Sequence, residues 1–452
     1  MKGVWCQIFI LFIVCYICDV LVFQTSIIMI KFTQKKLPNG MKLMCMPMKD
    51  SLSVTVLVMV HTGSKYEHRR NNGISHFLEH MCFKGTKKRP TAMDISRTLD
   101  EMGSQYNAFT SQEFTGYYVK AHPKHIDIII DVLSDLYQSP VLDPREIEKE
   151  KGVIVEEIRM EENLPHKQVQ DLFAQAMYGD QPAGWNILGS KDTVRKVTQK
   201  HLRTYHTSQY VAGATTILVS GNFNTRTISG KISRAWSGIS HTKKIQKKKV
   251  IEPQNRPKIL VKYKKTDQTQ LVLGVRSFAG KNKYSAALRV LDAVLGGGMS
   301  SRLFQKLREE MGVGYYVRTI IDEYTDHGYF AISLGADASR VHEVIQALLA
   351  ECSLLKKEKI SDTELSKAKE YLIGNTILSL ESSDAMAEFF AFQDITGEEI
   401  TTPERFIQKI RKVTADDVLK IAREIFTNDR LVFALMGRIR ETKQLREMCV
   451  FE

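Results

Sequence analysis

The stretch KVTQKHLRTYHTSQYVAGATTILVSGNF (Lys196–Phe223) returns later in the chain as KVTADDVLKIAREIFTNDRLVFALMGRI (Lys412–Ile439). Each copy has the pattern of a helix followed by a strand that ends in glycine. The copies are 216 residues apart, and the same separation relates VTVLVMVHTGS, which begins at Val54, to QLVLGVRSFAG, which begins at Gln270. Because the offset is constant at both ends, the sequence predicts two similar domains.

The domain boundaries follow from this repeat. We expect a first domain over residues 30–241 and a second over 258–452, joined by a basic, proline-containing linker at 242–257. Helical and strand patterns come in blocks rather than in strict alternation. The sequence therefore predicts an α+β protein with two homologous α/β domains, each an antiparallel sheet covered by helices on one face.

The first 29 residues form a hydrophobic leader that precedes the domain pattern. Its apolar run is interrupted by Asp19 and is shorter than the ~20 residues that a spanning helix needs. Three interpretations stay open: a membrane anchor through residues 4–28, an uncleaved signal, or sequence outside the mature chain. The third is favoured because the strand pattern begins directly after Met29, and membrane contact is expected only if the leader is retained.

Composition excludes several classes of protein. The 452 residues are 43% hydrophobic and 25% charged, as in globular proteins. The net charge of +13 comes from scattered basic residues without interleaved aromatics, so no nucleic-acid partner is expected. The seven cysteines are odd in number, which argues against a disulfide framework and for a reducing, cytoplasmic location.

The segment GISHFLEHMCFKGT (73–86) carries the strongest chemical signal. On a helix, His76 and His80 lie on one face and can bind one zinc ion, while Glu79 lies beside them. This is the zinc-protease motif HExxH in reverse order. The alternative is a pair of hydrogen-bonded histidines near the surface. The corresponding positions of the second copy are Asp292, Leu295 and Gly296, so the fold itself does not require the motif.

A third zinc ligand is expected from EIEKEKGVIVEEIRM (146–160). Glu150 and Glu157 are seven residues apart and therefore lie on the same face of a helix. Carboxylates that border an apolar face need a partner, and zinc would be one. A surface carboxylate is the alternative for Glu157.

At this point the chain resembles the pitrilysin/insulinase family of zinc metallopeptidases, especially the branch around mitochondrial processing peptidase and bacterial processing proteases. The resemblance rests on the two segments above together with NAFTSQEFTGYY and LGGGMSSRLFQKLREEMGVGYYV. It implies zinc as the cofactor, one ion per chain. It also implies half of a clamshell chamber, hence a homodimer or a paired homologous subunit.

The resemblance assigns roles to residues of the first domain. His76, His80 and Glu157 would bind zinc. Glu79 would be the general base that takes a proton from water, and Glu150 a carboxylate that tunes the site. Family spacing, not composition, selects Glu157 over its neighbour Glu156.

The resemblance also points to substrate contacts. Arg308 and Tyr315 would reach the active site from the second domain and steady the oxyanion, although the extra Tyr316 competes with Tyr315 for this role. Asn107 and Ala108 would lie on an edge strand to which the peptide substrate adds.

The sequence thus predicts a zinc metalloendopeptidase that hydrolyses short or unfolded peptides. The alternative is a non-catalytic core subunit of the same family. Such subunits usually lose part of HxxEH or the distal glutamate, whereas every piece is present here.

Overall fold

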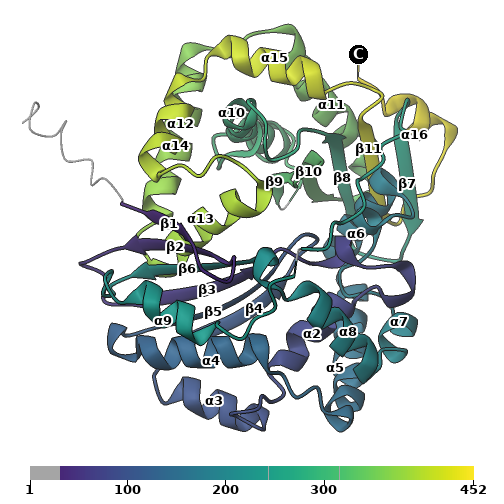
Figure 1. Cartoon of the computed structure of the whole chain (residues 1–452). Helices are drawn as coiled ribbons and strands as arrows, with labels where there is room; N and C mark the ends of the chain where they lie inside the picture. The colour runs from purple at the N-terminus through teal and green to yellow at the C-terminus, as the bar shows by residue number, and fades with distance from the viewer. Residues whose placement is uncertain (1–30, 243, 315, 452) are drawn as a thin grey trace, which may run out of the picture.

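The computed structural model describes residues 31–242, 244–314 and 316–451, which form two domains, one above the other in Figure 1. The predicted leader and Tyr315 lie outside these residues. Within the described part of 242–257 there is no helix or strand. None of the described helices combines the length and the apolar character that crossing a bilayer requires.

The first domain is built on a six-stranded sheet with the strand order β1-β2-β6-β3-β5-β4. Its strands are β1 (Thr33–Lys36), β2 (Lys42–Pro47), β3 (Val54–Val60), β4 (Gln105–Thr110), β5 (Thr115–Ala121) and β6 (Thr215–Gly221). Its helices are α2 (Ile74–Cys82), α3 (Ala92–Asp100), α4 (Ile126–Gln138), α5 (Pro144–Glu162), α6 (Pro165–Tyr178), α7 (Lys191–Arg195), α8 (Gln199–Gln209) and α9 (Ile228–Ala235).

The second domain is built on a five-stranded sheet with the order β7-β11-β8-β10-β9. Its strands are β7 (Lys258–Tyr263), β8 (Thr269–Arg276), β9 (Val317–Glu323), β10 (Gly328–Ala336) and β11 (Leu431–Gly437). Its helices are α10 (Ser285–Gly296), the π-helix η6 (Phe304–Glu310), α11 (Val341–Lys357), α12 (Asp362–Ser379), α13 (Ser383–Thr396), α14 (Pro403–Lys412), α15 (Ala415–Ile425) and α16 (Lys443–Met448).

The sheets are antiparallel except for one parallel pair in each. The closing strand of the first domain, β6, inserts between β2 and β3, parallel to β2 and antiparallel to β3. In the second domain β11 inserts in the same way between β7 and β8. The sequence did not reveal these parallel pairs, because the strands involved are about 170 residues apart and no hairpin turn marks their pairing.

Both faces of each sheet are covered, which explains why every residue of β3 is buried. Val54, Val56 and Val58 pack into the core formed with helices of the first domain. Leu57 and Met59 point to the other face and pack against α13 of the second domain. Alternate side chains of a strand point to opposite faces, so β3 belongs to two hydrophobic cores.

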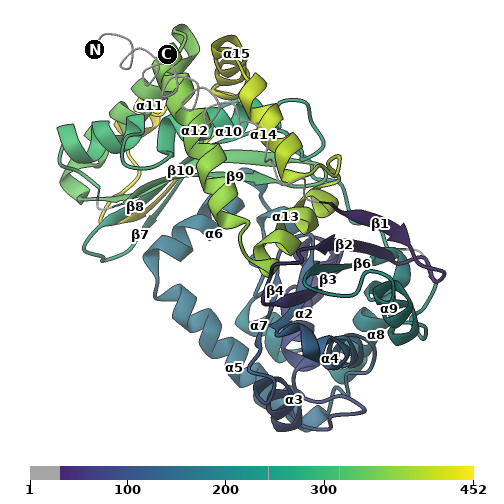
Figure 2. The same ribbon diagram turned by 90° about the vertical axis from the view of Figure 1, so that its left-hand side faces the viewer.

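Each of the two domains contributes one helix that packs on the sheet of the other. Helix α6 of the first domain packs on β8 and β11 of the second, while α13 of the second packs on β3 and β6 of the first. In Figure 2, α6 lies against the upper sheet and α13 beside β2 and β3. Because α6 and α13 occupy nearly equivalent places in the 216-residue repeat, each half covers the sheet face that the other leaves open. Each domain thus has the predicted layer of helices on one face of its sheet, and a helix of the other domain covers the opposite face.

Candidate metal centre

Helix α2 is anchored at its N-terminus by a buried carboxylate. Glu67 accepts hydrogen bonds from the backbone N–H of Gly73 (2.7 Å) and of Ser75 (2.8 Å). Unpaired N–H groups and the helix dipole favour an anion at this end. Gly73 has φ +95°, and a Cβ there would lie 2.5 Å from the carbonyl oxygen of Leu188. Glycine is therefore needed for α2 to start this close to the neighbouring loop.

His76 and His80 lie one turn apart on α2, as predicted. Their Nε2 atoms are 3.2 Å apart. His76 is buried, with 8% of its surface exposed. Two imidazoles that converge in a mostly buried place indicate a shared ligand.

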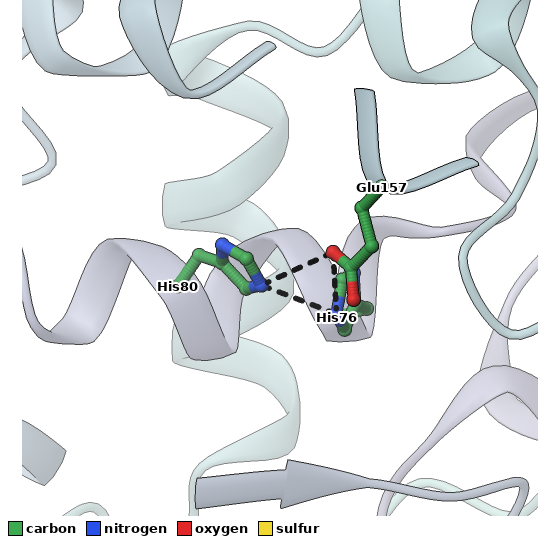
Figure 3. A group of neighbouring side chains, drawn as sticks. All are labelled: His76, His80 and Glu157. Carbon is green, nitrogen blue, oxygen red and sulfur yellow. Dashed lines mark hydrogen bonds and ion pairs between the residues drawn. The ribbon is translucent and has the colours of Figure 1, made fainter. Parts of the chain in front are cut away.

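Glu157 reaches the same point from α5. Its Oε2 lies 3.6 Å from Nε2 of His76 and 3.7 Å from Nε2 of His80. Figure 3 shows the carboxylate facing both rings from a separate helix. Glu156, in contrast, forms an ion pair with Arg159 on the exposed face of α5. The structure therefore places Glu157, and not Glu156, beside the two imidazoles.

The three ligand atoms fit a zinc ion. They form a group that could hold a metal, with all separations between 3.2 and 3.7 Å. Ligands at about 2.0–2.2 Å from a tetrahedral ion lie roughly 3.3–3.6 Å from one another. Two histidines and one glutamate are also the donor set of a catalytic zinc site that keeps a fourth position open.

Glu150 supports His80 from behind. Its Oε1 lies 2.8 Å from Nδ1 of His80, and its Oε2 lies 2.6 Å from Nζ of Lys84. Burial raises the pKa of Glu150, but the hydrogen bonds from His80 and Lys84 outweigh it and hold that pKa below its ordinary value. Glu150 is thus an ionised carboxylate behind the ligand, the arrangement typical of zinc-binding histidines.

Burial shapes the ionisation of the other groups. Burial and the nearby His80 lower the pKa of His76 to about 3, so its ring is neutral and able to bind a metal. For His80, burial is outweighed by Glu150, and the pKa is raised. Burial also raises the pKa values of Glu79 and Glu157. Four polar groups are therefore held in a partly desolvated site.

Glu79 is oriented by the hairpin β4–β5. The hydroxyl of Thr110, the last residue of β4, donates a hydrogen bond of 2.6 Å to Oε2 of Glu79. Among the described strands β4 is an edge strand, as predicted, and it pairs only with β5. Asn107 is exposed on it, with its Oδ1 accepting a hydrogen bond from the backbone N–H of Ala108 (2.9 Å). The roles of Asn107 and Ala108 in substrate binding stay predictions.

For the residues predicted from the second domain, the structure gives no contact with the candidate metal centre among those that it describes. Arg308 lies in η6, exposed, with its guanidinium 5.2 Å from the ring centroid of Phe304. Tyr315 is outside the described residues. The competing Tyr316 donates a hydrogen bond to Oε1 of Gln270 within the second sheet. A role for Arg308 or Tyr315 at the metal centre stays a prediction.

The second copy of the fold replaces the site with apolar packing. Asp292, at the position of His76, is half-buried, and its partial burial raises its pKa. Leu295 and Ile373, at the positions of Glu79 and Glu157, belong to the hydrophobic core. The second copy therefore shows that the fold forms without the residues of this group.

Three contributing residues were missed by sequence reasoning. Glu67, Thr110 and Lys84 act through hydrogen bonds to groups in other elements. Lys84 carried a weak signal, since it lies one helical turn beyond His80. Glu67 and Thr110 carried none, because an acidic residue before a helix and a threonine in a strand are common.

Comparison with known proteins identifies the family of the chain. Residues 47–191 match the family described as insulinase (peptidase family M16), and residues 196–372 match the peptidase M16 inactive domain. The chain is 34% identical over 391 residues to the uncharacterized zinc protease YmxG of Bacillus subtilis, covering 86% of this chain and 95% of that protein. It is 32% identical over 403 residues to an uncharacterized zinc protease of Rickettsia felis, covering 88% and 95%.

Solved structures share the fold. A protease from Helicobacter pylori superposes with a TM-score of 0.82 at 25% identity, covering 90% of this chain and 99% of that chain. A peptidase M16 inactive domain from Pseudomonas fluorescens gives a TM-score of 0.85 at 16% identity, covering 91% and 100%. The second similarity concerns the fold alone.

Proposed function

Because the chain belongs to the insulinase family (peptidase family M16), we propose that it is a zinc-dependent endopeptidase that hydrolyses short or unfolded peptides. The observation that carries the proposal is the convergence of His76, His80 and Glu157 within 3.7 Å of one another, with Glu79 beside them. At the equivalent positions of the second copy, Asp292, Gly296 and Ile373, the described structure forms no such group.

His76, His80 and Glu157 would hold the zinc ion. When bound there, zinc polarises water and the peptide carbonyl. The carboxylate of Glu79 accepts a proton from the attacking water and returns it to the leaving amine. Thr110 keeps that carboxylate in orientation. The free edge of β4 is suited to pair with the backbone of an extended peptide, with Asn107 exposed beside it.

Arg308 and Tyr315 complete the proposal as the groups that stabilise the oxyanion from the second domain. Since each chain supplies two domains, we propose that the active form is a homodimer or a pair with a homologous subunit. We place it in the cytoplasm, in keeping with four described cysteines that are buried and free.

The test is metal analysis combined with peptide cleavage. Purified protein should contain about one zinc per chain and cleave a quenched fluorogenic peptide, and a chelator should abolish cleavage. Glu79→Gln should keep the zinc and lose turnover by at least about 1,000-fold. Glu101→Gln, at an exposed position in the same domain, is the matched control and should behave like the parent.

Full turnover by Glu79→Gln would remove that residue from its role. A protein that binds zinc, yet cleaves neither peptides nor unfolded proteins alone or with a homologous subunit, would favour the non-catalytic core subunit instead.

A further inference from the structure

A buried ionic cluster lies where the two domains meet. The ammonium of Lys65, with 1% of its side chain exposed, lies 2.7 Å from Oε1 of Glu113 and 2.7 Å from Oδ1 of Asp326. Nδ1 of His327 is 3.1 Å away. An ammonium has three N–H groups, and two of them have carboxylate acceptors here, while Nδ1 of His327 also lies 3.1 Å from Oδ1 of Asp326.

This cluster is not a second metal site, although Glu113, Asp326 and His327 come close enough to hold a cation. The Lys65 ammonium already occupies the position between them. A second ammonium, that of Lys247 in the linker, lies 3.2 Å from Oε1 of Glu113 and 2.7 Å from Oδ1 of Asp326. Two cations and two carboxylates balance in charge.

The cluster joins elements that are far apart in sequence. Glu113 lies in the β4–β5 turn, and Asp326 lies in the β9–β10 turn of the second domain. Thr325 of that turn donates to Glu113 twice, from its backbone N–H (2.9 Å) and its hydroxyl (3.0 Å). The backbone N–H of Lys65 donates to the carbonyl of Gln112 (2.8 Å). The tip of the β4–β5 hairpin is therefore bound on two sides.

We propose that the β9–β10 turn of the second domain positions the β4–β5 hairpin for catalysis, acting through Lys65 and Glu113. The proposal rests on the proposed function, because the hairpin carries Thr110, which orients Glu79, and the edge strand for substrate. Asp326, Glu113 and Lys65 are thus positioning residues. They give the domain that lacks the metal motif a role in the chemistry of the other.

Two physical arguments support this role. In the part of the chain that the structure describes, β4 has a neighbouring strand on one side only, so its distal end depends on the turn for its position. Thr110 lies three residues before Glu113, and a displacement of about 1 Å at a catalytic group is enough to cost orders of magnitude in rate. The second argument concerns stability. Buried ion pairs often add little net stability compared with apolar packing, so the better explanation of this cluster is that it specifies one arrangement of the two turns.

The experiment uses the full chain with the double substitution Lys65→Met/Asp326→Asn. Removing one cation and one anion together leaves Lys247 and Glu113 as a balanced pair, which limits unfolding. The matched control is Lys120→Met/Asp384→Asn. It removes another ion pair between the domains, 2.8 Å long, at the far end of β5 from the turn. Both variants are compared with the parent well below their melting temperatures.

The readouts are zinc content, kcat and KM for a quenched peptide, and hydrogen–deuterium exchange of residues 105–115. We expect the cluster variant to keep one zinc, to exchange 105–115 at least tenfold faster, and to lose at least tenfold in kcat. The control should stay within about twofold of the parent in each. Unchanged exchange of 105–115, or an unchanged kcat in a parent that cleaves peptides, would overturn the proposal. If the parent cleaves nothing, the proposed function fails on its own, while exchange still decides whether the turn positions the hairpin.

Discussion

Nδ1 of His80 lies 2.8 Å from Oε1 of Glu150. An ionised carboxylate only accepts hydrogen bonds, so Nδ1 carries the proton and the lone pair of Nε2 is directed toward His76 and Glu157. Helix α5 therefore contributes twice to the candidate site, with Glu157 facing both imidazoles and Glu150 orienting the ring of His80.

Glu150→Gln should weaken zinc binding by about 10–100-fold, because a neutral amide oxygen accepts the hydrogen bond from Nδ1–H of His80 more weakly than a carboxylate and increases the basicity of the ring less. The measurement is zinc affinity by competition with a chromophoric chelator. Glu148→Gln, on the exposed face of the same helix, should keep the parent affinity. Equal affinities for both variants would show that the hydrogen bond does not tune the metal.

Glu157→Gln should abolish stable zinc binding, lowering affinity by more than about 100-fold, because an anionic ligand is lost. Glu156→Gln serves as the neighbouring control, since its side chain is 67% exposed and paired with Arg159. Metal content after dialysis distinguishes them. Loss of zinc from the Glu156 variant rather than from the Glu157 variant would reassign the third ligand.

Phe390→Ala should lower the free energy of unfolding by about 3–5 kcal/mol, the usual cost of emptying a core position. Phe390 is fully buried on α13, in the core shared with the sheet of the first domain. Phe392→Ala, two residues later and 46% exposed, should cost much less. Thermal melting of both variants checks this, and similar shifts would argue that α13 does not hold the domains together.

Stability should fall below about pH 5 in part because of Asp326. Burial raises its pKa, but interactions with His327, Lys247 and Lys65 outweigh it and hold that pKa well below its usual range. The unfolded chain takes up this proton near pH 4, before the folded chain does, so stability is complete above about pH 5 and is lost as pH falls. Melting temperature between pH 6 and 3 should therefore fall more steeply in the parent than in Lys65→Met/Asp326→Asn, and parallel curves would contradict this.

The sequence alone was sufficient for the domain repeat, the helix that carries His76 and His80, and the identity of Glu79 as their neighbour. These features depend on periodicity and spacing within one element or on a constant offset between two copies. Residue order decides such features directly, because the backbone geometry of a helix or strand fixes which side chains share a face. The edge position of β4 and the choice of Glu157 as the third ligand came from the resemblance. The structure places β4 at the edge of its sheet and Glu157 beside both imidazoles.

Only the tertiary structure decided which groups support the site. Glu67, Thr110 and the Lys65 cluster contact partners that lie from five to more than 250 residues away. The parallel strand pairs and the exchange of α6 and α13 between the domains have the same origin. A polar side chain has the same local signature whether it faces solvent or a buried partner, and only the packing of distant elements distinguishes the two.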